Sequence, residues 1–271
     1  MTSYLAVGHV CVDELVGRED RLGGTVFFSA GQAAAMGCDV SVLTSCTPAT
    51  AERARRQLGA AVALDVVDAP DDTRFEFGED AERGPQRLGS TATRLDDLGR
   101  HAGVDVLHLA PVFNELGPAL IDSARGRAGF VGATPQGLLR GTSATGALTF
   151  VAANWPAGDF ADAIVLNDEE YTDLRRIGLL DGFGGLVFRT LGPDGAAVLR
   201  HDVELARHRP APAEDDARPQ RTIGAGDVFA AAAFVAMASG DDVEVALGVA
   251  VEAATAYVRR SSDAPSFVDP R

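Results

Sequence analysis

The sequence contains no lysine: all 24 basic residues among its 271 residues are arginine. This absence excludes mechanisms that need a lysine side chain, such as the lysine of a Walker P-loop, the strand lysine of protein kinases and the Schiff-base lysine of pyridoxal phosphate enzymes. Cysteine is scarce as well, and Cys11, Cys38 and Cys46 are unevenly spaced without a Cys-x-x-Cys pair. We therefore expect neither a disulfide framework nor a zinc site, and we expect a reducing, cytoplasmic location.

Long hydrophobic runs and an excess of basic charge are also missing. The longest apolar run, residues 228–238, falls well short of the roughly 20 residues that span a bilayer. The chain does not open on a basic segment followed by an apolar one, so no signal peptide is expected. With 39 acidic and 24 basic residues the formal net charge is −15, and such a surface repels phosphate backbones and anionic lipids. Nucleic acids and membranes are therefore not expected as partners.

What the sequence does contain is a regular alternation of short apolar segments with Ala-rich segments of helical spacing. This alternation is typical of βαβ units that build a largely parallel sheet. The sequence thus predicts a single α/β domain over residues 1–271, with a mainly parallel central sheet and helices on both of its faces. The expected strands are residues 5–7, 40–43, 63–67, 104–109, 130–132, 163–166 and 186–189, and the expected helices are residues 27–36, 49–57, 115–124, 168–176, 226–239 and 242–259.

Two stretches interrupt this alternation. Residues 73–77 and 85–90 are typical of two alternating strands joined by a polar turn. Because they lie between units of the parallel sheet, we expect a small flap outside it, with lid strands within residues 9–22 and 72–90. Residues 207–221 are rich in proline and acidic side chains, and we expect a surface loop there because the residues after it are too few to fold alone.

The segment with the most chemical information is Thr-Ile-Gly-Ala-Gly-Asp-Val-Phe at residues 222–229. Small residues at 224–226 let the backbone turn sharply and approach a ligand closely. The helix expected to follow directs its free N–H groups and its positive dipole end at that ligand, which favours phosphate or another anion. Asp227 lies in the first turn of this helix, where a carboxylate can accept a proton from a hydroxyl during phosphoryl transfer. The same features are equally consistent with an Asp227 that only caps a buried helix.

This segment resembles the D-T-x-G-A-G-D signature of the ribokinase-like (PfkB) carbohydrate kinase family. Three further segments resemble other signatures of the family in the same order along the chain. The pair Gly23-Gly24 precedes a small-residue helix, residues 167–170 match an N-x-x-E segment, and residues 190–196 match a T-x-G…G-A hairpin. The resemblance covers about residues 5–260.

The resemblance implies a three-layer sandwich with a small β lid, and an ATP-dependent kinase that requires Mg²⁺ and phosphorylates a hydroxyl of a small sugar or polyol. The lid would exclude water as a competing acceptor, and two copies would dimerise through its strands. In such an enzyme Asp227 is the general base that deprotonates the acceptor hydroxyl. The backbone N–H groups of Gly224, Ala225 and Gly226 form the anion hole for the transferred phosphoryl group.

Other residues take their expected roles from the same resemblance. Asp13 is expected to hydrogen-bond hydroxyls of the acceptor, and Gly23 and Gly24 are expected to let the chain pass close to it. Asn167 and Glu170 are expected to place Mg²⁺ and its waters near the triphosphate. The residues expected to line the nucleotide are Asn167, Thr190, Gly192 and Gly195.

Two positions depart from the family's pattern. The first Asp of the signature is Arg221 here, and in many members that Asp lies close to an activating monovalent cation, so dependence on potassium stays open. Ribokinases carry Asn in the helix after the glycine pair where this chain has Phe28, so ribose is not the favoured acceptor. A ring or a more apolar acceptor is compatible with Phe28, and a role in the hydrophobic core is equally compatible.

The pattern Pro-Gln-Gly-x-x-Arg at residues 135–140 resembles that of inositol- and nucleoside-type members of the family. It follows an expected strand at its carboxyl end, where α/β sheets bind ligands. Gln136 is expected to bind hydroxyls and Arg140 an anionic substituent. Alternatively, Gln136 only bridges a loop and Arg140 pairs with a surface acid.

Several alternatives stand beside a sugar kinase. The chain could be a nucleoside or inositol kinase of the same family, or a non-catalytic member that binds a sugar or a nucleotide. The presence of Asp227 argues against a non-catalytic member, whereas Arg221 leaves it open. A dinucleotide-dependent dehydrogenase is excluded, because the third Gly of G-x-G-x-x-G is absent and a proline-rich acidic loop, not a strand, precedes the motif.

Overall fold

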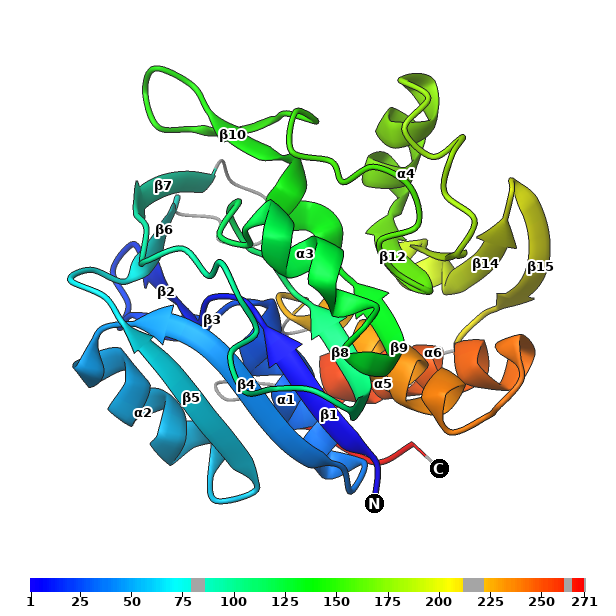
Figure 1. Cartoon of the computed structure of the whole chain (residues 1–271), viewed down its shortest axis with the longest axis horizontal. Coiled ribbons are helices and arrows are strands. Elements are labelled where there is room, and N and C mark those ends of the chain that lie inside the picture. The colour runs from blue at the N-terminus through cyan, green and yellow to red at the C-terminus, as the bar shows by residue number, and fades with distance from the viewer. Residues whose placement is uncertain (79–85, 212–221, 261–264, 271) are drawn as a thin grey trace.

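The computed structural model describes residues 1–78, 86–211, 222–260 and 265–270 (Figure 1). The strands of its largest layer are β1 (Ser3–Val7), β4 (Asp39–Cys46), β5 (Val62–Asp68), β8 (Val104–Leu109), β9 (Ala128–Ala133), β12 (Ala163–Asn167), β13 (Leu186–Thr190), β14 (Ala196–Arg200) and β15 (Val203–His208). They form one nine-stranded sheet in the order β15-β14-β13-β12-β9-β8-β1-β4-β5. Neighbouring strands are parallel from β13 to β5, and the pairs β13–β14 and β14–β15 are antiparallel.

Helices cover both faces of this sheet (Figure 1). They are α1 (Thr25–Ala35), α2 (Pro48–Leu58), α3 (Pro118–Ala124), α4 (Asp168–Arg176), α5 (Ala225–Ala238) and α6 (Val243–Arg260). Because side chains alternate along a strand, Tyr4 and Ala6 of β1 join the core with α1, α2, α5 and α6, while Leu5 and Val7 join the core with α3 and α4. The predicted α/β architecture with helices on both faces is confirmed.

A second, four-stranded sheet lies outside the large one. Its strands are β2 (Cys11–Leu15), β3 (Arg21–Gly23), β6 (Thr73–Phe77) and β7 (Gln86–Ser90), in the order β3-β2-β6-β7. A hairpin of β10 (Arg140–Thr142) and β11 (Leu148–Phe150) adjoins β7, where the N–H of Leu88 donates to the carbonyl of Gly146 at 3.0 Å. The sequence did not predict this hairpin.

One helix begins later than the sequence predicted. The expected helix at 115–124 starts at Pro118, because the buried Glu115 holds the preceding residues in a loop. Its carboxylate accepts hydrogen bonds from the N–H groups of Val112 (2.8 Å), Phe113 (2.7 Å) and His9 (3.0 Å). Pro118 then suits the first helical position, where no N–H is needed.

Other expectations concern loops. The surface loop expected at 207–221 starts later, since residues 207 and 208 belong to β15. Its part from 212 to 221 lies outside the described residues, as does the turn at 79–85.

Among the helices that the structure describes, none combines the length and the apolar character that a membrane crossing needs.

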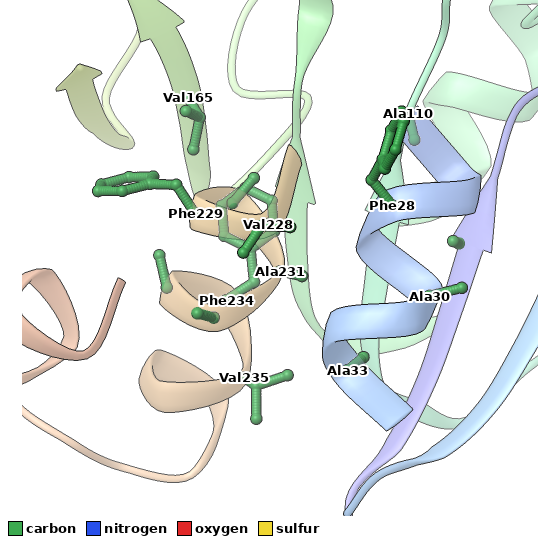
Figure 2. Close-up of a cluster of buried hydrophobic side chains, with 14 of the residues drawn as sticks. Phe28, Ala30, Ala33, Ala110, Val165, Val228, Phe229, Ala231, Phe234 and Val235 are labelled. Carbon is green, nitrogen blue, oxygen red and sulfur yellow. The ribbon is translucent and has the colours of Figure 1, made fainter. Parts of the chain in front are cut away.

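The site described below depends on the packing of α1 beside α5 in the core (Figure 2). Ala231 of α5 is buried on the side that faces α1, and such a small side chain lets two helices approach closely. The N-termini of the two helices meet as well, because the hydroxyl of Thr25 hydrogen-bonds the carboxylate of Asp227. The N-termini of α1 and α5 therefore lie next to each other.

Candidate active site

The turn before α5 is built for close approach to a ligand. Gly224 has a left-handed φ of 90°, and a Cβ there would lie 2.6 Å from the ring of Phe28. A Cβ on Gly226 would instead point into open space. The N–H of Ala225 already donates to the carbonyl of Thr222 at 3.0 Å, whereas the amide of Gly226 falls in the first helical turn, where amides have no helical acceptor. The N–H groups of Gly224 and Gly226 are therefore better placed than that of Ala225 to donate hydrogen bonds to an anion at this turn.

Asp227 follows this turn in an environment that disfavours its charge. Its pKa is raised from 3.8 to about 7, chiefly by burial, and the neighbouring carboxylates of Glu170 and Asp13 contribute to this rise. The hydroxyl of Thr25 and the guanidinium of Arg140 oppose this rise. A carboxyl with a pKa near 7 is suited to accept a proton near neutral pH.

These groups border one cavity of about 280 Å³. The small sheet contributes strands β2, β6 and β7 to its wall. The ends of β9, β12 and β13, the segment with Gln136 and Arg140, and the N-termini of α1, α4 and α5 contribute most of the rest. Most of the predicted site residues line it together: Asp13, Gly24, Phe28, Gln136, Arg140, Asn167, Glu170, Thr190, Gly224, Gly226 and Asp227.

The glycine pair has two separate functions in the structure. A Cβ on Gly23 would lie 2.6 Å from the carboxylate of Asp13, so Gly23, which does not line the cavity, leaves room for Asp13. Gly24 lines the cavity, and a Cβ there would meet the carbonyl of His9 at 2.4 Å and the sulfur of Cys11 at 2.8 Å. The chain therefore turns at Gly24 in close contact with the start of β2 and continues into α1.

The remaining predicted residues lie around a neighbouring pocket. Ala225, Gly192 and Gly195 line a space of about 270 Å³ that shares Thr190 and Gly226 with the main cavity. Its wall is mostly apolar, with side chains of Pro210, Phe229, Val251 and Ala254. The first turn of α5 thus separates a polar cavity from an apolar pocket.

A cation–π contact and two hydrogen bonds link the small sheet to the start of α4. The guanidinium of Arg140 lies 5.2 Å from the ring centre of Phe75 and donates to the carbonyl of Val112 at 2.9 Å and to the amide oxygen of Gln136 at 2.8 Å. Gln136 in turn donates to Oε1 of Glu170 at 2.9 Å. Burial lowers the pKa of Arg140 and raises that of Glu170. Gln136 and Arg140 therefore contact the expected magnesium residue as well as the cavity.

The fit of Mg²⁺ to this site depends on Glu170 and Asn167. They form a capping box at the N-terminus of α4: Oε2 of Glu170 accepts the N–H of Asn167 at 2.9 Å, and Oδ1 of Asn167 accepts the N–H of Glu170 at 2.8 Å. The described residues hold no cluster of three or more His, Cys, Asp or Glu side chains that could bind a metal ion. One carboxylate with waters and donor phosphates is a common arrangement for Mg²⁺, so the residues fit an ion that arrives with the donor.

Sequence reasoning missed several residues that line the cavity. A signal existed for Thr25, which follows the glycine pair, and for Phe75 and Phe77, which alternate on an expected strand. Ile223 lies within the motif at 222–229 but was given no role of its own, and no local pattern indicated Thr134, because its place depends on distant elements. The lining residues that were not among the predicted site residues are Cys11, Thr25, Phe75, Phe77, Gln86, Val112, Thr134, Val165 and Ile223.

Part of the chain resembles a known protein family in its sequence. Residues 169–269 match the sequence model described as pfkB family carbohydrate kinase. None of the curated proteins compared with the chain matches it.

Solved structures match over nearly the whole chain. A pyrophosphate-dependent kinase in the ribokinase family, complexed with a pyrophosphate analogue and myo-inositol, has a TM-score of 0.76 and 22% identity, over 98% of this chain and 97% of that one. Ribokinase from Cryptococcus neoformans var. grubii serotype A in complex with ADP has a TM-score of 0.75 and 17% identity, over 97% and 95%. Phosphofructokinase-2 from Escherichia coli in complex with substrates and products has a TM-score of 0.68 and 18% identity, over 100% and 97%. The resemblance found in the sequence is thus confirmed: the chain has the ribokinase-like fold, and its C-terminal part matches the pfkB carbohydrate kinase family.

Proposed function

We propose that the protein transfers a phosphoryl group to a hydroxyl of a small sugar or cyclic polyol. The observation that carries this proposal is the position of Asp227, a carboxyl with a raised pKa in the first turn of a glycine-led helix that borders a polar cavity. This arrangement combines a proton acceptor with N–H groups for a phosphoryl group at one helix N-terminus. A non-catalytic binding protein has no need of that combination.

Each residue of the site has a separate role in an in-line phosphoryl transfer. Asp227 takes the proton of the acceptor hydroxyl, and Asp13, in β2, orients the acceptor. The amides of Gly224 and Gly226 hold the phosphoryl oxygens as negative charge develops on them. Glu170 and Asn167 would hold Mg²⁺ through water, and that ion would neutralise charge on the donor phosphates. Gln136 keeps the carboxylate of Glu170 in place by a hydrogen bond.

We propose ATP as the donor. The apolar pocket beside the main cavity supports this choice, because Phe229, Val251 and Ala254 offer a surface on which a nucleotide base can pack. Thr190 lines both that pocket and the cavity where phosphates would bind, and Gly192 and Gly195 line the pocket. Pyrophosphate is the alternative donor, favoured by the similar structure of a pyrophosphate-dependent kinase.

The acceptor end of the cavity favours a compact ring that carries hydroxyls. Phe28, Phe75 and Phe77 supply apolar surface to the cavity, while Asp13 and Gln86 supply polar groups. A sugar or inositol ring has apolar C–H faces and a rim of hydroxyls, which matches this pairing. A nucleoside is the alternative acceptor.

We further propose that the chain is one cytoplasmic domain in which β2, β3, β6 and β7 act as a lid over the cavity. The hairpin of β10 and β11 already lies against the edge strand β7. A homodimer formed through the lid would therefore pair along its other edge strand, β3.

The experiment measures phosphoryl transfer with Mg²⁺ and either ATP or pyrophosphate, against hexoses, pentoses, inositols and nucleosides. We expect acceptor-dependent turnover that Asp227→Asn lowers about 10²–10⁴-fold, the usual contribution of a general base. Asp122→Asn, which changes an exposed side chain in α3, serves as the charge-matched control. Unchanged turnover in Asp227→Asn would remove the proposed base. Binding of a donor without transfer to any acceptor would favour the non-catalytic alternative, and absence of donor binding would overturn the proposal.

A further inference from the structure

The turn before α5 is held from outside its own helix. The hydroxyl of Tyr257, in α6, donates to the carbonyl of Ile223 at 2.8 Å across 34 positions of the sequence. The hydrogen bonds of α5 begin one residue later, where the N–H of Val228 donates to the carbonyl of Gly224 at 3.0 Å. The carbonyl of Ile223 therefore lies outside the helical ladder, although Ile223 and Gly224 both line the main cavity.

Tyr257 cannot easily leave this position. Its side chain is fully buried, and its ring stacks on Phe267 with centres 5.9 Å apart and planes 22° apart. Phe28, which also packs on Gly224, meets the same ring edge-on at 6.3 Å. Phe267 itself lies against Gly31 of α1, where a Cβ would come within 2.3 Å of its ring. The phenol is thus fixed between α1, α6 and the C-terminal segment.

The peptide group between Ile223 and Gly224 connects this hydrogen bond to the cavity. No peptide bond of the described chain is cis, so the carbonyl of Ile223 and the N–H of Gly224 point in opposite directions. Glycine populates positive and negative φ about equally well, so a peptide next to Gly224 could rotate at low cost if nothing held it. A hydrogen bond to one end of the peptide fixes the direction of the other end.

We propose that Tyr257 is a positioning residue for phosphoryl transfer: by holding the carbonyl of Ile223, it directs the N–H of Gly224 into the cavity as an anion-binding donor. This inference rests on the proposed function, since it assigns a role within the same site. Tyr257 touches neither the phosphoryl group nor the acceptor and acts only through the peptide that it holds. Removing its hydroxyl should therefore weaken transition-state binding more than acceptor binding.

The test compares Tyr257→Phe with Tyr171→Phe, which removes a phenol hydroxyl that donates to Asp202 on the surface. We expect Tyr257→Phe to lower kcat about 10- to 100-fold, somewhat less than the loss of a whole oxyanion donor, with KM for the acceptor within about twofold. Tyr171→Phe should keep both values. Phe267→Leu serves as a packing control, because it loosens the ring stack and keeps the hydroxyl. An equal fall of kcat in Phe267→Leu, or no fall in Tyr257→Phe, would overturn the proposal.

A second readout does not depend on enzyme activity. Hydrogen exchange of peptides that cover residues 222–228 should become faster in Tyr257→Phe, while the peptides of β1 and β8 keep the exchange of the wild type. If the wild type transfers no phosphoryl group, the proposed function is wrong. Hydrogen exchange alone then tests whether Tyr257 holds the turn at residues 222–228. Unchanged exchange at 222–228, or faster exchange throughout the molecule, would then refute the positioning role.

Discussion

Asp227 holds a proton more tightly than an ordinary aspartate because it is buried and lies near two other carboxylates. Burial and two nearby carboxylates raise its pKa to about 7, and the hydroxyl of Thr25 limits the rise by hydrogen-bonding the charged form. As a base, Asp227 works only when deprotonated. At the scale of the residue, activity should therefore fall as the pH drops through about 7.

This reasoning predicts the effect of removing the Thr25 hydroxyl. Thr25→Val deletes an interaction that favours the charged carboxylate, so the pKa of Asp227 should rise and the acidic limb of kcat/KM should move to higher pH. The variant should be impaired at pH 7 and recover towards wild-type activity above pH 8, about one to two units above the wild-type midpoint. Thr25→Ser keeps a hydroxyl and should keep the wild-type profile. Superimposable limbs in Thr25→Val and wild type would contradict the assignment.

At the scale of the element, the turn before α5 provides fewer ligands for a monovalent cation than the sequence pattern of the family does. The carbonyl of Ile223, a typical type of potassium ligand, already accepts the hydroxyl of Tyr257. The sequence places Arg221 where the family has an acidic residue, although Arg221 lies outside the described residues. The residues on this turn therefore fit a potassium ion poorly.

We accordingly predict that turnover is independent of potassium. Rates in sodium, potassium and tetramethylammonium chloride at equal ionic strength should agree within about twofold, which corresponds to less than about 0.5 kcal/mol in activation free energy. The measurement uses the wild type with Mg²⁺ and a saturating donor. Strong stimulation by potassium alone would show that a cation site exists despite Arg221 and the Tyr257 hydrogen bond.

The elements that sequence reasoning found are those with a strong local pattern. Buried parallel strands such as β12 contain a continuous apolar run, Ala-Ile-Val-Leu, and α5 is a long Ala-rich segment after a glycine turn. β14 and β15 were missed as strands because their turn uses His201 and Asp202 with φ of 47° and 63°, not the Asn-Gly pair that usually indicates such a hairpin. The strands of the β10–β11 hairpin are only three residues long, and β10, Arg-Gly-Thr, has no apolar side chain.

The site itself was predicted only where a motif is contiguous. Asp227 and the glycines around it lie in one segment, so the sequence indicated them together. The hydrogen bond from Tyr257 to Ile223 and that from Thr25 to Asp227 join elements far apart in the chain. Such contacts follow from the packing of α1, α5 and α6, which no local pattern encodes.

At the scale of the whole molecule, the raised pKa of Asp227 has a cost for the folded state. The folded protein binds the Asp227 proton more tightly than the unfolded chain, where the pKa is 3.8, so the stability that this group contributes falls as the pH rises from about 4 to about 7. Above about pH 7 both states have lost the proton and the penalty stays constant. A neutral side chain at this position avoids the penalty altogether.

Asp227→Asn should therefore be more stable than the wild type, and the gain should depend on pH. The difference in the free energy of unfolding should widen by about 2 kcal/mol between pH 5 and pH 7 and remain level to pH 8.5, since each unit of pKa difference corresponds to about 1.4 kcal/mol. Urea denaturation at these pH values measures it. Asp122→Asn removes one negative charge from the same protein of net charge −15 at an exposed site, so its difference from the wild type should stay nearly constant over this range. A gain of the same size and pH profile in both variants would mean that relief of general charge repulsion, and not the burial of Asp227, stabilises the fold.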